Sequence, residues 1–403
     1  MNHNQESNGF YGLGIAPAIL EILNRLHFKN PTPIQAQTIP IAIQGKDVVG
    51  IAQTGTGKTL AFGIPMIQML ARKKGQGLVL LPTRELALQV EQELHKVGQP
   101  LGLKTAVLIG GMSMRPQIAA IARNPHVIIA TPGRLIDHLG QKTLRLDKVS
   151  ILVLDEADRM LDMGFQPQIR RILQTVPKDR QTMLFSATIP SEIMKIAGEH
   201  MKLPVHVEVA PSGTAPETVT HEIFIVEKAA KSRLLTTLLK EHRGSTLVFT
   251  RTKFGAKRVT KALRVLGESV AEIHSNRSLA QRREALEGFR SGRFRVLVAT
   301  DIASRGIDVK DIETVINYDL PSTAEDYVHR IGRTGRAGST GHAISFAEPS
   351  QRNEVRSIER LMRKSVPVSL PPAGFSQEPD ARTEFNAPRP VRYPGMNRRR
   401  RRW

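Results

Sequence analysis

One short segment places the tightest limit on how this chain folds. The apolar stretch 48–52 runs directly into a loop that contains Gly55, Gly57, Lys58 and Thr59, and a helical pattern follows. Strand, glycine loop and helix in this order are typical of a phosphate-binding loop in a parallel α/β sheet. The glycines let backbone N–H groups turn towards phosphate oxygens. Lys58 supplies a charge to the β and γ phosphates, and Thr59 offers a hydroxyl to Mg²⁺. A merely flexible glycine loop is the alternative.

Two carboxylates follow another apolar stretch, 151–154, which is predicted to be a strand buried on both faces. In open α/β sheets, ligands bind outside the carboxyl ends of the strands. Asp155 is therefore placed to hold Mg²⁺, directly or through water, and Glu156 can orient a water for attack on a phosphate. The alternative is a strand that ends in solvated acids. The phosphate loop upstream and the arginines downstream favour catalysis.

Further predicted strands of the first half span 77–81, 107–109, 127–130 and 182–185. Hydroxyls, glycines and arginines at strand ends can contact a sugar-phosphate backbone. Taken singly, each strand end is more simply an ordinary turn, but their repetition favours a nucleic-acid track. After the last of these strands, Ser186 and Thr188 either sense the nucleotide or cap the helix that starts after Pro190. The candidates for the track are Pro82, Thr83, Arg84, Gly110, Gly111, Thr131, Pro132, Gly133 and Arg134.

Strand–helix alternation restarts after a segment rich in proline, glycine and hydroxyl residues, which indicates a flexible linker. The sequence therefore predicts an α/β fold with two tandem doubly wound parallel-sheet domains and a disordered basic tail. The expected boundaries are 1–208 for the N-terminal domain, 209–217 for the linker, 218–365 for the C-terminal domain and 366–403 for the tail. In the second half, helices are predicted over 230–241, 253–266 and 279–291, and strands over 246–250, 270–273 and 296–299.

The second half has no Gly-Lys-Thr loop, but it has a run of arginines separated by small residues, 329–336. Such a run cannot form a packed apolar face, yet it can reach across a cleft to a triphosphate. Arg333 and Arg336 are the candidate arginine fingers, which would offset charge on the transferring phosphoryl group. A basic loop that faces RNA is the alternative.

The chain carries a net charge of +21. Segment 366–403 contributes eight arginines against three acids, so the rest of the chain still carries +16. A polyanionic partner, foremost a nucleic acid, is the natural inference, and a merely soluble basic protein is the alternative. The tail would raise nucleic-acid affinity without sequence preference. The chain has no cysteine, so disulfides and thiolate metal sites are excluded, which fits a reducing cytoplasm. No apolar run approaches the ~20 residues of a membrane span.

Together these motifs resemble the DEAD-box RNA helicases of superfamily 2, in order from Phe10 to about Gly341. Phe10 and segment 31–35 are similar to the adenine-sensing Q motif, in which Gln35 can read an adenine edge. Segment 52–59 resembles motif I, and 155–158 resembles the name-giving motif. Segment 298–308 and the arginine run resemble the last two motifs. The short N-terminal arm and basic tail look most like bacterial RhlE-type members.

The resemblance implies two RecA-like domains that close on ATP, Mg²⁺ and single-stranded RNA, clamp the RNA backbone in a bent form and separate short duplexes locally. It implies nucleotide binding by Phe10, Phe28, Gln35, Gln53, Thr54, Gly55, Thr56, Gly57, Lys58, Thr59, Asp301, Gly306 and Asp308, with Asp301 approaching the ribose. Catalysis would involve Lys58, Asp155, Glu156, Arg333 and Arg336, with Thr59 and Asp155 on the metal. Arg251 and Thr300 would join the RNA contacts, and Asp158, Ser186, Thr188 and His329 would couple the sites. Specificity for RNA would rest on 2′-hydroxyls.

Two positions depart from the family pattern. His27 stands where the Q motif usually has glycine, and Leu279 stands where a Gln-x-x-Arg contact would place its glutamine, with Arg282 as its arginine; a shifted alignment would use Gln281 instead. An ATP-dependent RNA helicase or remodeller of RNA–protein complexes in the cytoplasm is the first hypothesis. A nucleotide-gated RNA clamp or annealing chaperone, and a DNA helicase, are the alternatives. Partners from ribosome assembly or RNA decay fit the first hypothesis.

Overall fold

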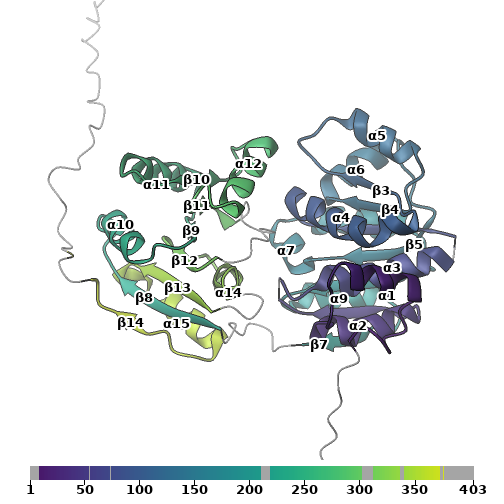
Figure 1. Cartoon of the computed structure of the whole chain (residues 1–403), viewed down its shortest axis with the longest axis horizontal. Coiled ribbons are helices and arrows are strands. Elements are labelled where there is room, and N and C mark those ends of the chain that lie inside the picture. The colour runs from purple at the N-terminus through teal and green to yellow at the C-terminus, as the bar shows by residue number, and fades with distance from the viewer. Residues whose placement is uncertain are drawn as a thin grey trace, which may run out of the picture.

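The structure is a computed structural model, and it describes residues 9–53, 55–72, 74–209, 218–301, 312–335, 340–372 and 375. Two seven-stranded sheets form two separate units that lie side by side (Figure 1). The predicted linker lies almost wholly outside the described residues, as does the end of the predicted tail. Within the described residues, no helix combines the length and the apolar character needed to cross a membrane.

The first sheet has the strand order β3-β4-β2-β5-β6-β1-β7, and all its pairs are parallel. Its strands are β1 Val48–Ile51, β2 Gln76–Leu80, β3 Thr105–Leu108, β4 Val127–Ala130, β5 Val149–Leu154, β6 Gln181–Ser186 and β7 Val205–Glu208. Successive strand residues point to opposite faces, so Val153 and Leu154 enter two different apolar cores. Burial on both faces explains why these strands are continuous apolar runs.

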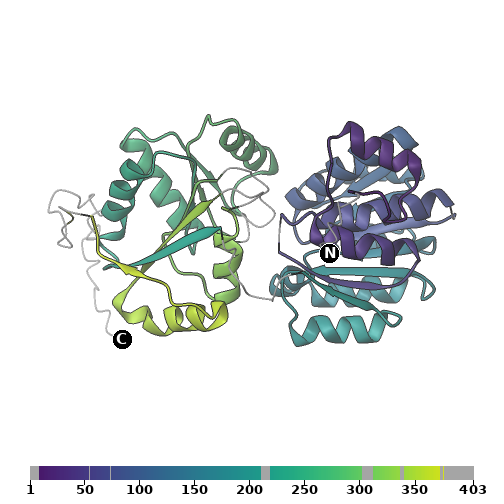
Figure 2. The same ribbon diagram turned by 60° about the horizontal axis from the view of Figure 1, so that its bottom comes forward.

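Helices cover both faces of the first sheet, as Figure 2 also shows. One core is closed by α1 Pro17–Arg25, α2 Pro33–Ile43, α3 Lys58–Arg72 and α4 Arg84–Gly98. The other is closed mainly by α6 Pro132–Gly140, α7 Ala157–Asp162, α8 Gln166–Thr175 and α9 Ser191–His200. The short helix α5 Met114–Ala122 packs at the β3 edge.

The second sheet has the order β10-β11-β9-β12-β13-β8-β14, again with parallel pairs. Its strands are β8 Val219–Ile225, β9 Thr246–Phe249, β10 Val270–Ile273, β11 Val296–Ala299, β12 Thr314–Asn317, β13 Gly341–Ala347 and β14 Val368–Ser369. Helices α10 Lys231–Glu241 and α11 Lys253–Val265 cover one face. Helices α12 Leu279–Arg290, α14 Ala324–Ile331 and α15 Arg352–Met362 cover the other.

The two sheets therefore share one topology, strand for strand, although their sequences are not close repeats. Each described strand of the first sheet has a counterpart seven positions later, so β8 stands where β1 stands and β12 where β5 stands. The fold is α/β with two doubly wound parallel sheets, as predicted.

The predicted start of the tail at residue 366 is too early. Val366 is buried, the Ile223 N–H donates to the Pro367 carbonyl at 2.8 Å, and β14 pairs with the edge of β8. The C-terminal domain thus extends at least to Ser369. The prolines that suggested a disordered tail lie beside a short edge strand, where their missing N–H groups are tolerated.

Candidate ATP and RNA site

The phosphate loop connects β1 to α3, at the carboxyl end of the first sheet. Lys58 is the first residue of α3 and is buried, and its ammonium donates to the Ala52 carbonyl at 2.9 Å across the loop. The Ala52 N–H donates to the Ser186 carbonyl at 3.0 Å, so the loop starts beside the end of β6. Gly57 has φ +88°, a left-handed conformation that favours glycine. Phosphate binding by this loop stays a prediction, and Thr54 lies outside the described residues.

Gln35, the glutamine of the Q motif, contacts the phosphate loop directly. Its Nε2 donates to the Gly57 carbonyl at 3.0 Å, and its Oε1 accepts from the Thr32 N–H at 2.9 Å. The expected reading of adenine by Gln35 stays a prediction, because in this conformation the amide links α2 to the loop. Phe10 is buried in the apolar core on this face, and Phe28 packs against the same core.

His27 adopts φ +61°, in the region that glycine favours. The backbone turn after α1 therefore explains why a glycine is usual at this position. The side chain of histidine is tolerated there at a conformational cost.

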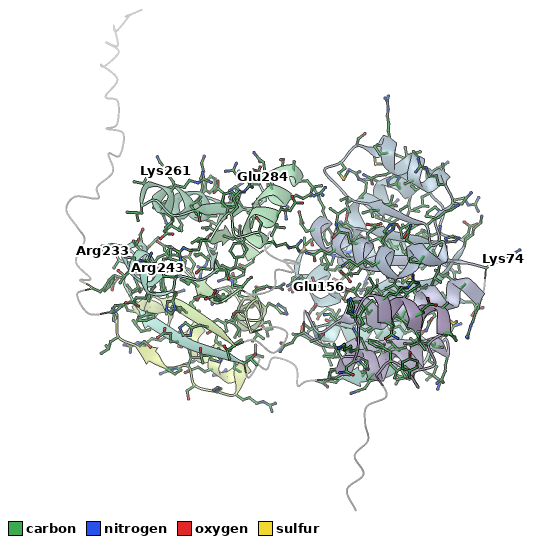
Figure 3. All side chains as sticks on the ribbon, in the orientation of Figure 1. Lys74, Glu156, Arg233, Arg243, Lys261 and Glu284 are labelled. Atoms are coloured by element: carbon green, nitrogen blue, oxygen red, sulfur yellow. The ribbon has the colours of Figure 1, made fainter. Side chains whose placement is uncertain are left out.

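The two acids predicted for catalysis follow β5 and are both buried. The Asp155 N–H donates to the Leu80 carbonyl at 3.0 Å, and Asp155 Oδ1 accepts from the Glu156 N–H at 2.9 Å. Glu156 has φ +51° and ψ +51°, a strained conformation for a residue other than glycine. Such strain is concentrated at functional sites. Figure 3 shows Glu156 on the side of the first domain that faces the second.

Burial raises the pKa of the Asp155 carboxyl to about 6; the charge of Lys58 opposes this shift and Glu156 adds to it. Burial alone would raise the pKa of Glu156 as well. The charges of Arg159 and Lys58 instead lower the pKa of Glu156 below its usual value, and Arg333 from the second domain contributes. Arg159 donates to Glu156 in a buried ion pair. Cations from both domains thus favour the charged form of the acid that is predicted to orient the attacking water.

Three of the four residues predicted to couple the sites, Asp158, Ser186 and Thr188, form one hydrogen-bonded cluster after β5 and β6. Asp158 Oδ2 accepts from the Ala187 N–H at 3.1 Å, from the Thr188 N–H at 3.0 Å and from the Thr188 hydroxyl at 3.0 Å. The Asp158 N–H in turn donates to the Ser186 hydroxyl at 3.3 Å. The alternative of a helix cap is wrong, because α9 has Pro190 at its N-cap and no side-chain cap.

The second domain places α14 against this cluster. Arg159 lines a small cavity together with residues from the second domain only, namely Phe249, Asp301, Asp326, His329, Arg330 and Arg333. Burial, with the charge of Arg159, lowers the pKa of His329 to about 4, although Asp158 opposes the shift. Arg333 is buried, and its Nε donates to the His329 carbonyl at 3.2 Å. Arg336, Gly306 and Asp308 lie outside the described residues.

Asp301 is engaged within its own domain. Its Oδ2 accepts from Arg330 Nη2 at 2.7 Å, and its Oδ1 pairs with Arg330 Nε at 2.5 Å. A contact between Asp301 and the ribose would have to compete with this bidentate pair, and it stays a prediction.

The track residues of the first domain come together at one sheet edge. The strands that they follow, β2, β3 and β4, are neighbours in the sheet. Arg84 lies directly over Gly110 and Gly111, where an added Cβ at Gly111 would collide with its guanidinium. The Arg134 guanidinium donates to the Met112 carbonyl at 2.9 Å. Thr83 instead caps α4, accepting from the Leu86 N–H at 3.3 Å. In the second domain, Arg251 and Thr300 follow the neighbouring strands β9 and β11.

Helix α12, which has Leu279 where the family pattern has glutamine, contacts the first domain. Leu279 packs against the apolar core of the first domain, and its helix α12 presents Arg282 to Glu85 at 2.9 Å. Both charged side chains are largely buried, at 13% and 4% exposure. Glu85 follows Arg84 in the predicted track, so this ion pair joins the two domains beside it.

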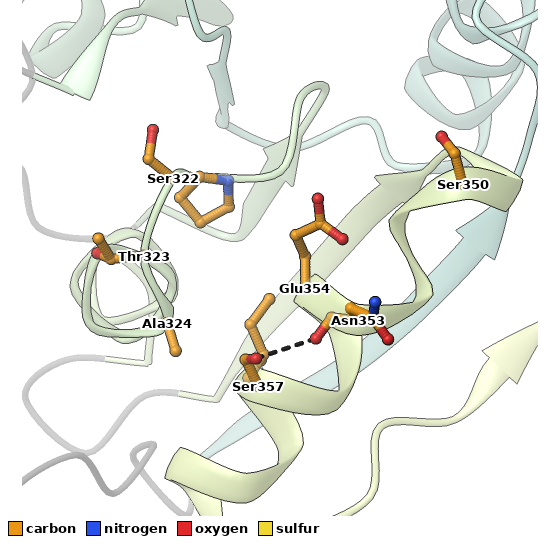
Figure 4. Close-up of a pocket in the computed structure, with 9 residues that line it drawn as sticks. Ser322, Thr323, Ala324, Ser350, Asn353, Glu354 and Ser357 are labelled. Atoms are coloured by element: carbon orange, nitrogen blue, oxygen red, sulfur yellow. Dashed lines mark hydrogen bonds between the residues drawn. The ribbon is translucent and has the colours of Figure 1, made fainter.

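Several of these residues were missed by sequence reasoning. Arg159 carried a signal, because its position three residues after Glu156 places both on one side of a helical turn. Glu85 carried none, and Arg330 belongs to the predicted arginine run but gave no sign of its partner, since both partners lie far away in the sequence. A pocket of about 320 Å³ lies elsewhere, between the turn before α14 and helix α15 (Figure 4). None of its lining residues belongs to the predicted site.

The fold and the site together define a class of protein, a two-domain ATPase. The first domain carries the phosphate loop and the acids, and the second domain supplies the cations. The chain belongs to the DEAD-box ATP-dependent RNA helicases. Residues 32–196 match the DEAD/DEAH box helicase family, and 230–338 match the helicase conserved C-terminal domain. The helicase CshA of Geobacillus kaustophilus is 44% identical over 367 residues, covering 90% of this chain and 78% of the relative. CshA of Bacillus subtilis is 42% identical over 360 residues, covering 89% and 73%.

Solved structures of helicases bound to RNA share the fold. Dbp5 of S. cerevisiae, bound to RNA and ADP BeF3, is 31% identical with a TM-score of 0.82, covering 90% of this chain and 95% of that one. Mss116p, bound to single-stranded RNA and AMP-PNP, is 28% identical with a TM-score of 0.80, covering 89% and 78%. This chain is therefore an RNA-binding, ATP-dependent helicase with two RecA-like domains.

Proposed function

We propose that ATP lies between the two domains, with its phosphates on the loop of the first and its γ-phosphate facing Arg333 of the second. The observation that carries this proposal is Glu156, a strained and buried acid that Arg159 contacts and whose pKa Arg333 lowers from across the domain boundary. Charge on a transferring phosphoryl group is stabilised by cations fixed in this way. Lys58 binds the β and γ phosphates, and Glu156 orients the attacking water.

Mg²⁺ fits the donors that the site offers. Mg²⁺ prefers oxygen ligands and is usually held by one or two carboxylates together with substrate phosphates and water. Asp155 supplies a buried carboxylate at the end of β5, and Thr59 supplies a hydroxyl in the first turn of α3. When bound, Mg²⁺ neutralises charge on the phosphates. The protein side chains orient the nucleotide and exclude water around it.

RNA binding is proposed to run along the ends of β2, β3 and β4 and to continue onto the second domain at Arg251 and Thr300. Contacts to the backbone carry no sequence information, so binding is expected to be unspecific in sequence. Asp158 and Thr188, joined by a hydrogen bond of 3.0 Å, are proposed to transmit domain closure from His329 to the nucleotide. A clamp or annealing chaperone with little unwinding is the second candidate, but no observation in the structure favours it.

An unwinding assay on a short RNA duplex tests the proposal, with Glu156→Gln and Lys58→Ala as variants. Glu156→Gln is expected to bind ATP but to lose turnover, because the water loses its orienting carboxylate. Lys58→Ala is expected to lose ATP binding and hydrolysis together. Undiminished hydrolysis by either variant contradicts its assigned role. ATP turnover without strand separation would favour the clamp, and equal stimulation by DNA would favour a DNA helicase.

We also propose a cellular setting for this activity. The absence of cysteine supports a cytoplasmic location, and the family supports partners in ribosome assembly or RNA decay. The bacterial RhlE type stays a prediction that rests on the short arm and basic tail, whereas the relatives reported above are CshA proteins.

A further inference from the structure

A buried lysine in the second domain occupies the position that Lys58 occupies in the first. Lys58 begins α3, the helix after β1, and Lys231 begins α10, the helix after β8. Because the two sheets have the same strand order, β1 and β8 are counterparts. Lys231 is only 2% exposed. A buried ammonium is costly unless it is paired, so its partners show what the position does in the second domain.

The charged partners of Lys231 are carboxylates of its own domain. The Lys231 ammonium lies 3.0 Å from a Glu348 carboxylate oxygen and 3.4 Å from a carboxylate oxygen of Asp319. It also lies 5.9 Å from the centre of the Tyr318 ring. Glu348 follows β13, which neighbours β8 in the sheet, and Asp319 follows β12, the strand on the other side of β13. The charge of Lys231 is thus used inside the domain.

Asp319 connects this lysine to two functional segments. Its second carboxylate oxygen accepts from the Arg251 N–H at 3.0 Å, and the next carbonyl, of Leu320, accepts from the Arg251 guanidinium at 3.1 Å. The Asp319 carbonyl accepts from Arg330 Nη1 at 2.6 Å. Arg330 lies on α14, three residues before Arg333. One short turn after β12 therefore holds both a proposed RNA contact and the helix that leads to the arginine finger.

We propose that Lys231 is a positioning residue that couples RNA binding to ATP turnover by fixing the Asp319 turn. The inference rests on the proposed function, because it assigns RNA contact to Arg251 and catalysis to Arg333. Without the ammonium, Asp319 and Glu348 face each other as uncompensated acids, and Asp319, at 28% exposure, turns towards water. The Arg251 N–H then loses its acceptor, and the turn that carries the Arg330 contact shifts. Nucleotide contacts in the first domain are untouched.

The test is steady-state ATP turnover of the full-length chain with a single-stranded RNA oligonucleotide. Lys231→Met is expected to raise the half-saturating RNA concentration about tenfold and to lower kcat at saturating RNA, with the KM for ATP changed less than twofold. Lys231→Arg is expected to recover most of both effects, because it restores the charge. Glu348→Gln is the matched control: it leaves the pair with Asp319 intact and is expected to bind RNA as the wild type does.

A purely structural role would lower the melting temperature and the active fraction while leaving both half-saturation values unchanged, and that result overturns the proposal. An effect of Glu348→Gln as large as that of Lys231→Met overturns it too. If Lys231→Met does not fold, Lys231→Met/Glu348→Gln removes the excess buried charge and must still show the RNA defect. RNA stimulation of the wild type tests the proposed function separately, so the two failures are distinguishable.

Discussion

The ion pair between Arg282 and Glu85 is the contact whose removal should open the two domains most directly. Its N–O distance is 2.9 Å, and the side chains are 13% and 4% exposed. Removing one partner of a buried pair costs about 3–5 kcal/mol, because the other charge remains buried without compensation. In Arg282→Met, Glu85 regains water only when the domains separate. The substitution therefore destabilises the closed form and not the open form. A destabilisation of about 3 kcal/mol lowers the ratio of closed to open molecules roughly a hundredfold.

Domain closure can be followed by fluorescence energy transfer in the presence of an ATP analogue and single-stranded RNA. The chain has no cysteine, so one engineered cysteine in each domain can be labelled selectively. Arg282→Met should shift the population towards the open form and raise the half-saturating RNA concentration. Arg283→Met is the matched control, since its pair with Glu287 is 3.9 Å long and both side chains are more than half exposed. Such surface pairs contribute about 0–1 kcal/mol.

A double-mutant cycle identifies the cause. Glu85→Gln/Arg282→Met removes both charges and should close more readily than Arg282→Met alone, because no unpaired charge remains buried. If Arg282 instead acts by contacting RNA, the double variant will be at least as impaired as the single one. Behaviour of Arg282→Met indistinguishable from that of Arg283→Met would also refute the reasoning.

Three further outcomes are expected from local structure. Gly57→Ala should nearly abolish ATP binding, as measured by nucleotide fluorescence, because φ +88° is strained for alanine and the new methyl collides with the Gln35 amide. His27→Gly should raise the free energy of unfolding by about 0.5–1 kcal/mol in denaturant titrations, because it relieves a left-handed backbone at φ +61°. Burial lowers the pKa of the His138 imidazole in the folded chain. As the pH falls through 6.5, the unfolded chain therefore takes up a proton at this histidine before the folded chain does, so the free energy of unfolding should be fully present above pH 6.5 and fall below it. His138→Asn should reduce this pH dependence in thermal melts.

Sequence reasoning located nine of the fourteen described strands, because each of these is a short apolar run bounded by turn residues, but it did not predict β7, β8, β12, β13 or β14. Val127–Ala130, Val270–Ile273 and Val296–Ala299 match their predicted limits to the residue. It also placed the acids at a strand end and Lys58 in a loop just before a helix, whereas α3 begins at Lys58 itself. These features follow from patterns that are local in the sequence. The shared strand order of the two sheets has no such local signature, so the correspondence of Lys58 with Lys231 required the structure.

Contacts across long separations were equally inaccessible. Glu85 reads as an ordinary acid in the first turn of a helix, and nothing nearby indicates a partner in the other domain. Asp319 has no distinguishing pattern around it in the sequence, although it joins Lys231 to Arg251. The predicted start of the tail at residue 366 was wrong for the opposite reason. Prolines dominate the local sequence there, and they made the short edge strand β14 unrecognisable.

The central claim is that both domains grip one nucleotide. A crystal structure of the chain with a non-hydrolysable ATP analogue, Mg²⁺ and single-stranded RNA tests it most directly. The γ-phosphate should lie within hydrogen-bond distance of Lys58 from one side and Arg333 from the other, with Glu156 beside the attacking water. An Arg333 side chain turned away from the nucleotide while RNA is bound would contradict the claim.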